Sequence, residues 1–252
     1  MTNPARTAEG ANVLTACLNG SRRPGEHPAV PLTPAQLAEA GAQAVAAGAH
    51  ALHVHPRDDR GDETLDARHV DAVVAAVRAA APGVVTGVTT GAWIAPDPEA
   101  RLGAVRSWHV LPDVVSVNWH EPGAERVADA LLSRGTGVEA GLWDVEAARF
   151  FVRGPLAGSC CRILLEPMEP SVSAALGTAE RMLDLVAPLG VPIQLHGCER
   201  TTWPVLASAA RQGFEVRIGL EDVLLLPDGT PAAGNADLVA AAVAVIDGSA
   251  VS

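Results

Sequence analysis

The sequence has 252 residues, of which 48% are hydrophobic, and a formal net charge of −11, so it can bury a sizeable core. The acidic balance argues against a nucleic-acid partner, because nucleic-acid binders usually present a basic patch. All 18 basic residues are arginine, and the absence of lysine excludes Schiff-base aldolases, pyridoxal-phosphate enzymes and Walker-type NTPases.

The four cysteines (Cys17, Cys160, Cys161 and Cys198) form no CxxC pair, and no secretory leader is recognised, so we expect a cytoplasmic protein. The longest apolar runs are alanine-rich and interrupted by charge, which predicts no membrane span. Residues 1–11 are polar and unpatterned and are expected to form a flexible tail. We expect a single domain over residues 1–252.

Strand-like and helix-like segments alternate along the chain, beginning with a strand at 13–19. The first helix is predicted from a Thr33 cap, with Pro34 at its first position, to about Ala47. The next strand–helix pairs are predicted at 51–55 with 67–80, 84–89 with 98–108, and 114–119 with 124–133.

The second half repeats this alternation, with pairs at 138–142 and 145–152, 162–165 and 173–187, 192–196 and 202–212, and 215–220 and 236–246. Eight β/α units in about 250 residues predict a TIM barrel, whose active site lies where the strands end. An open doubly wound sheet is the alternative, but no G-x-G-x-x-G follows the first strand.

His53 and His55 are two residues apart at the end of the second predicted strand. Side chains at positions i and i+2 of a strand share a face, so both imidazoles point the same way, a geometry suited to one metal ion. The alternative is that they only line a polar barrel mouth.

Closure of the barrel would place the eighth strand beside the first, and so bring Glu221 near this pair. Two histidines and a carboxylate leave a coordination position open for water or substrate. We therefore predict a metal site of His53, His55 and Glu221, with Zn²⁺ favoured, although other divalent ions accept these ligands. Alternatively, Glu221 is a salt-bridged surface carboxylate.

Asp222 directly follows the predicted ligand and could act as a base. Arg217, on the preceding strand, could pair with Asp222 or with an anionic substrate. A purely structural ion pair is the competing interpretation.

Several polar residues are predicted to contact substrate because they fall at strand ends or in the following loops: Thr89, Thr90, Gly91, Ser116, Asn118 and Arg22. The Thr-Thr-Gly turn offers hydroxyls and backbone N–H groups that could hold a carboxylate. Ser116 and Asn118 share one strand face, and Arg22 could meet an anionic substrate. Loop hydrogen bonds, contacts within the barrel and solvated charge are the respective alternatives.

Four segments together resemble the β-keto acid cleavage enzymes: Asn19-Gly20, residues 28–34 (PAVPLTP), residues 53–58 (HVHPRD) and residues 217–222 (RIGLED). The resemblance covers nearly the whole chain. It implies a zinc-dependent TIM barrel, usually a homotetramer, that condenses a β-keto acid with acetyl-CoA and releases acetoacetate and a new acyl-CoA.

The resemblance also implies roles for individual residues. His53, His55 and Glu221 would hold zinc, Asp222 would remove a C2 proton, and Arg217 would orient that base. Thr89 and Asn118 would contact the substrate carboxylate.

One departure from the family pattern concerns the substrate. The first loop, Ser21-Arg22-Arg23, is basic where the founding enzyme has an acidic residue for an ammonium group, so we expect an anionic or neutral β-keto acid. A second departure is the turn at 196–199 (HGCE), where relatives often carry a Gly-rich turn with arginine; this turn bears on the acetyl-CoA contacts.

Two alternative functions remain at this stage. One is a metal-dependent amidohydrolase, which normally carries H-x-H on the first strand. The other is a catalytically silent ligand-binding barrel.

Overall fold

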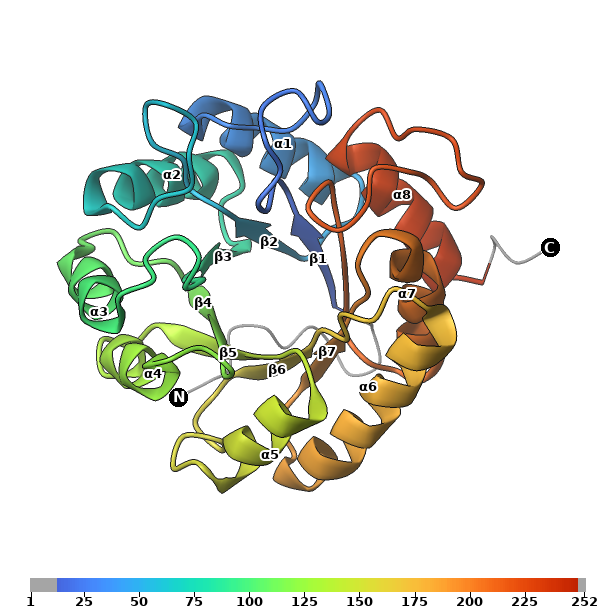
Figure 1. Cartoon of the computed structure of the whole chain (residues 1–252). Helices are drawn as coiled ribbons and strands as arrows, with labels where there is room; N and C mark the ends of the chain where they lie inside the picture. The colour runs from blue at the N-terminus through green and yellow to red at the C-terminus, as the bar shows by residue number, and fades with distance from the viewer. Residues whose placement is uncertain (1–12, 249–252) are drawn as a thin grey trace.

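The computed structural model describes residues 13–248 as a ring of parallel strands surrounded by helices (Figure 1). The strands are β1 (Leu14–Cys17), β2 (Ala51–Val54), β3 (Val85–Thr89), β4 (Val114–Asn118), β5 (Gly137–Leu142), β6 (Arg162–Leu165), β7 (Ile193–Leu195) and β8 (Val216–Ile218). This is the predicted TIM barrel. The tail predicted at residues 1–11 lies outside the described residues.

The helices follow their strands in the predicted order. They are α1 (Pro34–Ala46), α2 (Ala67–Ala80), α3 (Pro98–Ser107), α4 (Ala124–Leu132), α5 (Val145–Arg153), α6 (Val172–Val186), α7 (Thr202–Arg211) and α8 (Asn235–Ile246), with short 3-10 helices η1 (Ala187–Leu189) and η2 (Glu199–Thr201). The predicted Thr33 cap is present as a full capping box with Gln36. The sequence prediction missed η2, which begins directly after the loop that follows β7.

Ring closure is visible in the strand pairing. The hydrogen-bonded order runs β7-β6-β5-β4-β3-β2-β1-β8, so β1 pairs with both β2 and β8. The ring is completed by one parallel bridge between Gln194 and Glu215, which joins β7 to β8. This closure rules out the open doubly wound sheet.

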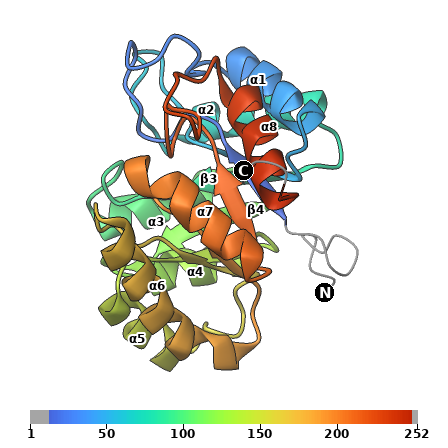
Figure 2. The ribbon, with the colours of Figure 1, turned by 90° about the vertical axis from the view of Figure 1, so that its right-hand side faces the viewer.

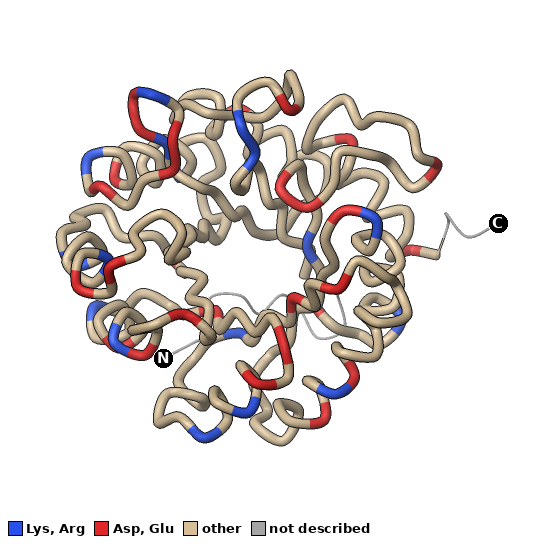
Figure 3. The backbone as a smooth tube through the Cα atoms, viewed as in Figure 1, with Lys and Arg blue, Asp and Glu red and all other residues tan. Residues whose placement is uncertain are grey.

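Helices cover the outside of the ring, and α7 packs between α6 and α8 (Figure 2) and against β7 and β8. Acidic and arginine residues are interspersed around the loops and helices (Figure 3). Within residues 13–248, no helix combines the length and apolar character needed to cross a bilayer.

The interior of the barrel contains charge as well as apolar side chains. Arg162 on β6 is 3% exposed and forms ion pairs with Glu139 on β5 and, at 2.5 Å between Nε and Oε2, with Glu215 before β8. Burial raises the pKa of Glu215 above its ordinary value, although Arg162 opposes this shift. The Gln194 amide also donates to the Thr15 hydroxyl across the barrel at 3.0 Å.

We expect Arg162→Met to lower the free energy of unfolding by about 3–5 kcal/mol, because it leaves the buried Glu139 and the partly buried Glu215 without their partner. Urea unfolding followed by circular dichroism measures the change. The matched control is Arg68→Met on α2, since Arg68 pairs with Asp59 in solvent and such pairs contribute little. Equal stability of the two variants would show that the buried network is dispensable.

Candidate metal centre and active site

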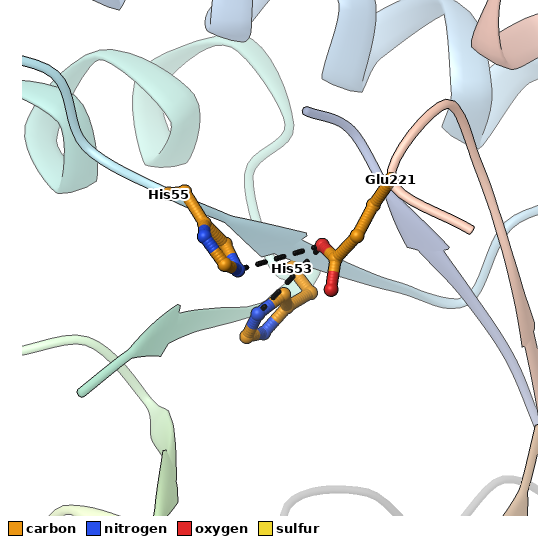
Figure 4. Close-up of side chains that lie close together, drawn as sticks. All are labelled: His53, His55 and Glu221. Carbon is orange, nitrogen blue, oxygen red and sulfur yellow. Dashed lines mark ion pairs between the residues drawn. The ribbon is translucent and has the colours of Figure 1, made fainter. Parts of the chain in front are cut away.

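His53, at the end of β2, and His55, just beyond it, both point into the barrel mouth toward Glu221 (Figure 4). The Nε2 atoms of His53 and His55 lie 4.0 Å and 3.6 Å from Glu221 Oε2. One ligand atom from each of the three residues falls within 4.8 Å of the others. The structure therefore brings the predicted metal-binding residues together.

Glycines explain how Glu221 reaches the histidines. A Cβ on Gly219 would overlap the Cys17 carbonyl, so only glycine lets the end of β8 lie this close to β1. The backbone N–H of Glu221 then donates to Cys17 O at 3.3 Å. Gly20, with φ of +51°, leaves the space that the Glu221 side chain occupies.

Two buried asparagines tie the loop after β1 to its neighbours. Asn19 accepts from the His55 N–H at 2.9 Å and donates to the His55 carbonyl at 2.8 Å. Asn235, at the start of α8, accepts from Leu220 N at 2.9 Å and donates to Leu18 O at 2.9 Å. These bonds fix the backbone on both sides of the Glu221 turn.

Glu63 lies behind the site and was not anticipated from the sequence. Its Oε1 is 2.6 Å from His55 Nδ1, and its Oε2 accepts from the Trp93 indole N–H at 3.1 Å. A carboxylate on Nδ1 holds the proton there and leaves Nε2 of His55 free to bind a metal. Glu63 reaches this place because its loop folds back to form an antiparallel bridge with Arg57.

Electrostatics favour ligation by these residues. Burial lowers the pKa of His53 to about 3, even though Glu221 opposes the shift, so its imidazole is neutral at physiological pH. Burial alone would raise the pKa of Glu221, but Arg217 together with His55 and His53 holds it below its usual range. A neutral imidazole and an ionised carboxylate are the forms that bind metal.

Arg217 bridges the two adjacent carboxylates. Its Nη2 contacts Glu221 Oε1 and lies 2.5 Å from Asp222 Oδ1. Burial raises the pKa of Asp222 above its ordinary value although Arg217 opposes the change. The two neighbouring acids therefore have pKa values displaced in opposite directions, the pattern expected of a ligand beside a base.

The residues fit a divalent ion on a second ground. Glu221 Oε2 is buried and makes no hydrogen bond, whereas Oε1 is bound by Arg217. A buried carboxylate oxygen without a donor is costly unless a cation satisfies it. This oxygen is the one that faces His53 and His55.

A small cavity adjoins these residues. Three of the predicted substrate-binding residues line it: Thr89, Ser116 and Asn118. The hydroxyl of Thr90 instead donates to Ser116 O at 2.7 Å. Gly91 lies beneath the Trp93 indole, which a Cβ at this position would overlap.

Arg22 lies apart from this cavity. Its Nε donates to Leu220 O at 2.8 Å, and its Nη2 lies 2.7 Å from Glu199 Oε1. The guanidinium thus supports the turn that carries Glu221, and Glu199 beside it has a left-handed φ of +52°. This contact differs from the contact with an anionic substrate or cofactor, and from the solvated charge, that the sequence predicts for Arg22.

The opposite wall contains a residue that sequence reasoning missed. Glu166 directly follows β6, and its Oε2 is 3.2 Å from Nε2 of His196, which follows β7. His196 Nδ1 lies 3.6 Å from Asp222 Oδ1. Leu164 lines the cavity, and side chains two residues apart in a strand share a face. This alternation indicates that Glu166 also faces inward.

Comparison with known proteins finds relatives that match nearly the whole chain. The chain is 26% identical over 244 residues to a 3-keto-5-aminohexanoate cleavage enzyme of Fusobacterium nucleatum subsp. nucleatum, covering 90% of this chain and 88% of the relative. It is 24% identical over 246 residues to the enzyme of the same description from Acetoanaerobium sticklandii, with the same two coverages.

A solved ternary complex of ObcA with a C4-CoA adduct and oxalate superposes with a TM-score of 0.65 and 16% sequence identity. The match covers 88% of this chain but only 64% of that structure, and it supports the barrel fold. The family profile described as beta-keto acid cleavage enzyme matches residues 12–250. This chain belongs to the beta-keto acid cleavage enzyme family.

Proposed function

We propose that this member of the family cleaves its β-keto acid, with acetyl-CoA as co-substrate, at a zinc centre held by His53, His55 and Glu221. The convergence of two buried imidazoles on an unsatisfied carboxylate oxygen carries the proposal. When bound, the ion would act as a Lewis acid on the substrate keto oxygen, which lowers the cost of forming an enolate. Zinc is favoured by the donor set, although other divalent ions accept the same ligands.

Asp222 would remove the C2 proton. Its raised pKa makes it a stronger base than an ordinary aspartate, and its ion pair with Arg217 keeps the carboxylate in one orientation. The resulting carbanion would attack the thioester of acetyl-CoA. The attack would release the CoA thiolate, which would add to the original keto carbon. The retro-Claisen step would then break the bond between that carbon and C2, which gives the new acyl-CoA and the carbanion of acetoacetate, and Asp222 would return the proton to this carbanion.

The substrate carboxylate would be held by the hydroxyls of Thr89 and Ser116, which line the cavity. The Thr89 hydroxyl accepts from Gly91 N at 3.2 Å, which leaves its own proton to donate to a carboxylate. Thr90 and Gly91 would hold this turn in place. The Thr90 hydroxyl donates to Ser116 O, and the Gly91 N–H donates to the Thr89 hydroxyl.

The two alternative functions receive less support. An amidohydrolase of the H-x-H type adds histidines from strands five and six, whereas here Trp143 and Glu166 follow β5 and β6. A silent ligand-binding barrel would not require Asp222 and Arg217 to be paired beside the metal ligands.

We also propose a cytoplasmic homotetramer. The four cysteines are all free thiols, which suits a reducing compartment. The tetramer rests on family resemblance alone, and light scattering of the purified protein would test it.

The reaction is tested by incubating the protein with acetyl-CoA and a panel of β-keto acids, and by detecting acetoacetate and acyl-CoA by mass spectrometry. Asp222→Asn should lower kcat by about 100-fold to 10,000-fold while metal remains bound, because the amide cannot accept the proton. The control is Asp184→Asn, at an exposed position on α6. Full turnover by the Asp222 variant would remove it as the base, and amide hydrolysis without acetyl-CoA would favour the amidohydrolase.

The metal site is tested by elemental analysis and by titration against a competing chelator. We expect one zinc per chain, and we expect Gly20→Ala to weaken zinc binding by about 10-fold to 100-fold, because the new Cβ displaces Glu221.

The matched control is Gly25→Ala. Gly25 lies in the same loop and also has positive φ (+92°), but its added Cβ would contact nothing within 4 Å. Equal zinc affinities for the two alanine variants would mean that Glu221 is not a ligand.

A further inference from the structure

The five tryptophans differ in how their indole N–H groups are hydrogen-bonded. Three of them donate to protein acceptors: Trp93 to Glu63 Oε2 at 3.1 Å, Trp108 to Leu65 O at 2.8 Å and Trp203 to Leu225 O at 2.9 Å. The Nε1 atoms of the other two, Trp119 and Trp143, are buried and have no hydrogen-bond partner within residues 13–248. A buried donor without an acceptor is costly, so each of these groups needs an explanation.

Of these two, Trp143 lines the cavity beside the proposed metal ligands. It follows β5 and lies two residues after Gly141, where an added Cβ would overlap Oδ1 of the cavity-lining Asn118. Side chains two residues apart in a strand share a face, so Trp143 also points into the barrel. Trp119 comes one residue after Asn118, and it lines a separate cavity at the N-termini of α4 and α5.

Two neighbouring rings hold the Trp143 indole in place. Its ring centroid lies 4.4 Å from that of His120 and 6.4 Å from that of Trp93. Trp93 follows β3 and Trp143 follows β5, so their contact crosses the end of β4, the strand between them. The indole therefore lies beside the part of the cavity to which β3 and β4 contribute Thr89 and Ser116.

The stronger donors that line this cavity are engaged within the protein. Arg217 pairs with the two carboxylates that follow it in the chain, and the Asn118 amide donates to a glutamate three residues later at 3.0 Å. Among the described residues that line the cavity, Trp143 has the buried N–H without an acceptor. It joins the hydroxyls of Thr89 and Ser116 as a donor available to a ligand.

The acceptor that these donors fit is a carboxylate. In the proposed reaction the keto oxygen of the β-keto acid is polarised at the metal centre, so the carboxylate is the acceptor left for them. Each hydroxyl donates one hydrogen bond, whereas the two oxygens of a carboxylate accept about four. A hydrogen bond to an ionised acceptor is also roughly twice as strong as one between neutral groups, so a third donor contributes substantially to binding.

We propose that the indole N–H of Trp143 donates a hydrogen bond to the carboxylate of the bound β-keto acid, as a third donor beside the hydroxyls of Thr89 and Ser116. This inference rests on the proposed function. The bond would be present both before and during the reaction, so its loss should raise KM and leave kcat nearly unchanged.

The test is Trp143→Phe, which keeps an aromatic ring against His120 and Trp93 but removes the N–H. Calorimetry of zinc-loaded protein with acetoacetate, in the absence of acyl-CoA, measures binding without turnover. We expect the variant to bind acetoacetate about 10-fold to 100-fold more weakly, because it loses a hydrogen bond to a charged group. Methyl acetoacetate, whose ester is uncharged, should lose only about 2-fold to 5-fold.

The matched control is Trp119→Phe. It removes an equally buried N–H without a partner, but one that lies outside this cavity, so the dissociation constant for acetoacetate should not change. Thermal unfolding of both variants checks that they are folded.

A direct readout is the indole N–H resonance of the wild-type protein. Labelling with nitrogen-15 tryptophan gives five indole signals, and the two phenylalanine variants identify those of Trp143 and Trp119. The Trp143 signal should move downfield when acetoacetate is added, because its proton enters a hydrogen bond. The Trp119 signal should stay in place.

Equal acetoacetate affinities of wild type and Trp143→Phe, or a Trp143 signal that does not move, would overturn the inference. Unchanged affinity together with a lower kcat in the full reaction would place the N–H on the thioester oxygen, which also overturns the assignment to the carboxylate. Failure of the proposed function looks different: acetoacetate would bind with the same dependence on Trp143, but no acyl-CoA would form from acetyl-CoA and the panel of β-keto acids.

Discussion

The site depends on the close contact between the end of β8 and the end of β1. Because Gly219 has no side chain, the backbone of β8 passes against the Cys17 carbonyl, and the next turn delivers Glu221 toward β2. A larger residue would move the carboxylate away from the histidines and would also displace Asp222. Asn19 and Asn235 then hold this turn from its two sides. The glycine in the R-x-G-x-E-D segment is thus a geometric requirement of the site.

Arg217 makes a strongly acidic site compatible with folding. Asp222 is buried and the adjacent Glu221 is partly buried, so without a cation nearby the charged forms of both carboxyls would be disfavoured. A single guanidinium contacts both, and it cannot lose its proton at any physiological pH. Arg162 has the same relation to Glu139 and Glu215 deeper in the barrel. Buried arginines facing pairs of acids thus occur at two levels of the interior.

The fold was predictable because it rests on local signals. Alternating strand-like and helix-like segments recur eight times, side-chain caps such as Thr33 begin five of the eight helices α1 to α8, and strand order follows chain order in this architecture. The grouping of His53, His55 and Glu221 followed from closure of the ring. These predictions needed only two facts: side chains two residues apart in a strand share a face, and the first and last strands of a closed barrel are neighbours.

Other parts of the site depend on how loops fold back, and no periodic pattern encodes that. Glu63 reaches His55 through a loop with an antiparallel bridge, and Arg22 turns toward Glu199 instead of the cavity. The orientation of the Asn118 amide depends on its partner Glu121, which only the structure reveals. Sequence patterns therefore located the metal-binding side of the cavity better than the side opposite it.

The joint between β7 and β8 has a mechanical consequence. A single bridge, Gln194 with Glu215, closes the ring there, whereas the other neighbouring strands share several paired residues. Glu166 and His196 stand on one side of this seam, and Arg217 and Asp222 on the other. Movement at this joint would change the distance between these two pairs of residues. The more extensively paired strands β1 and β2 would stay in place. Strand pairing is therefore least extensive at this joint, and the amide protons of Leu195 and Glu215 should be among the first strand protons to exchange with solvent.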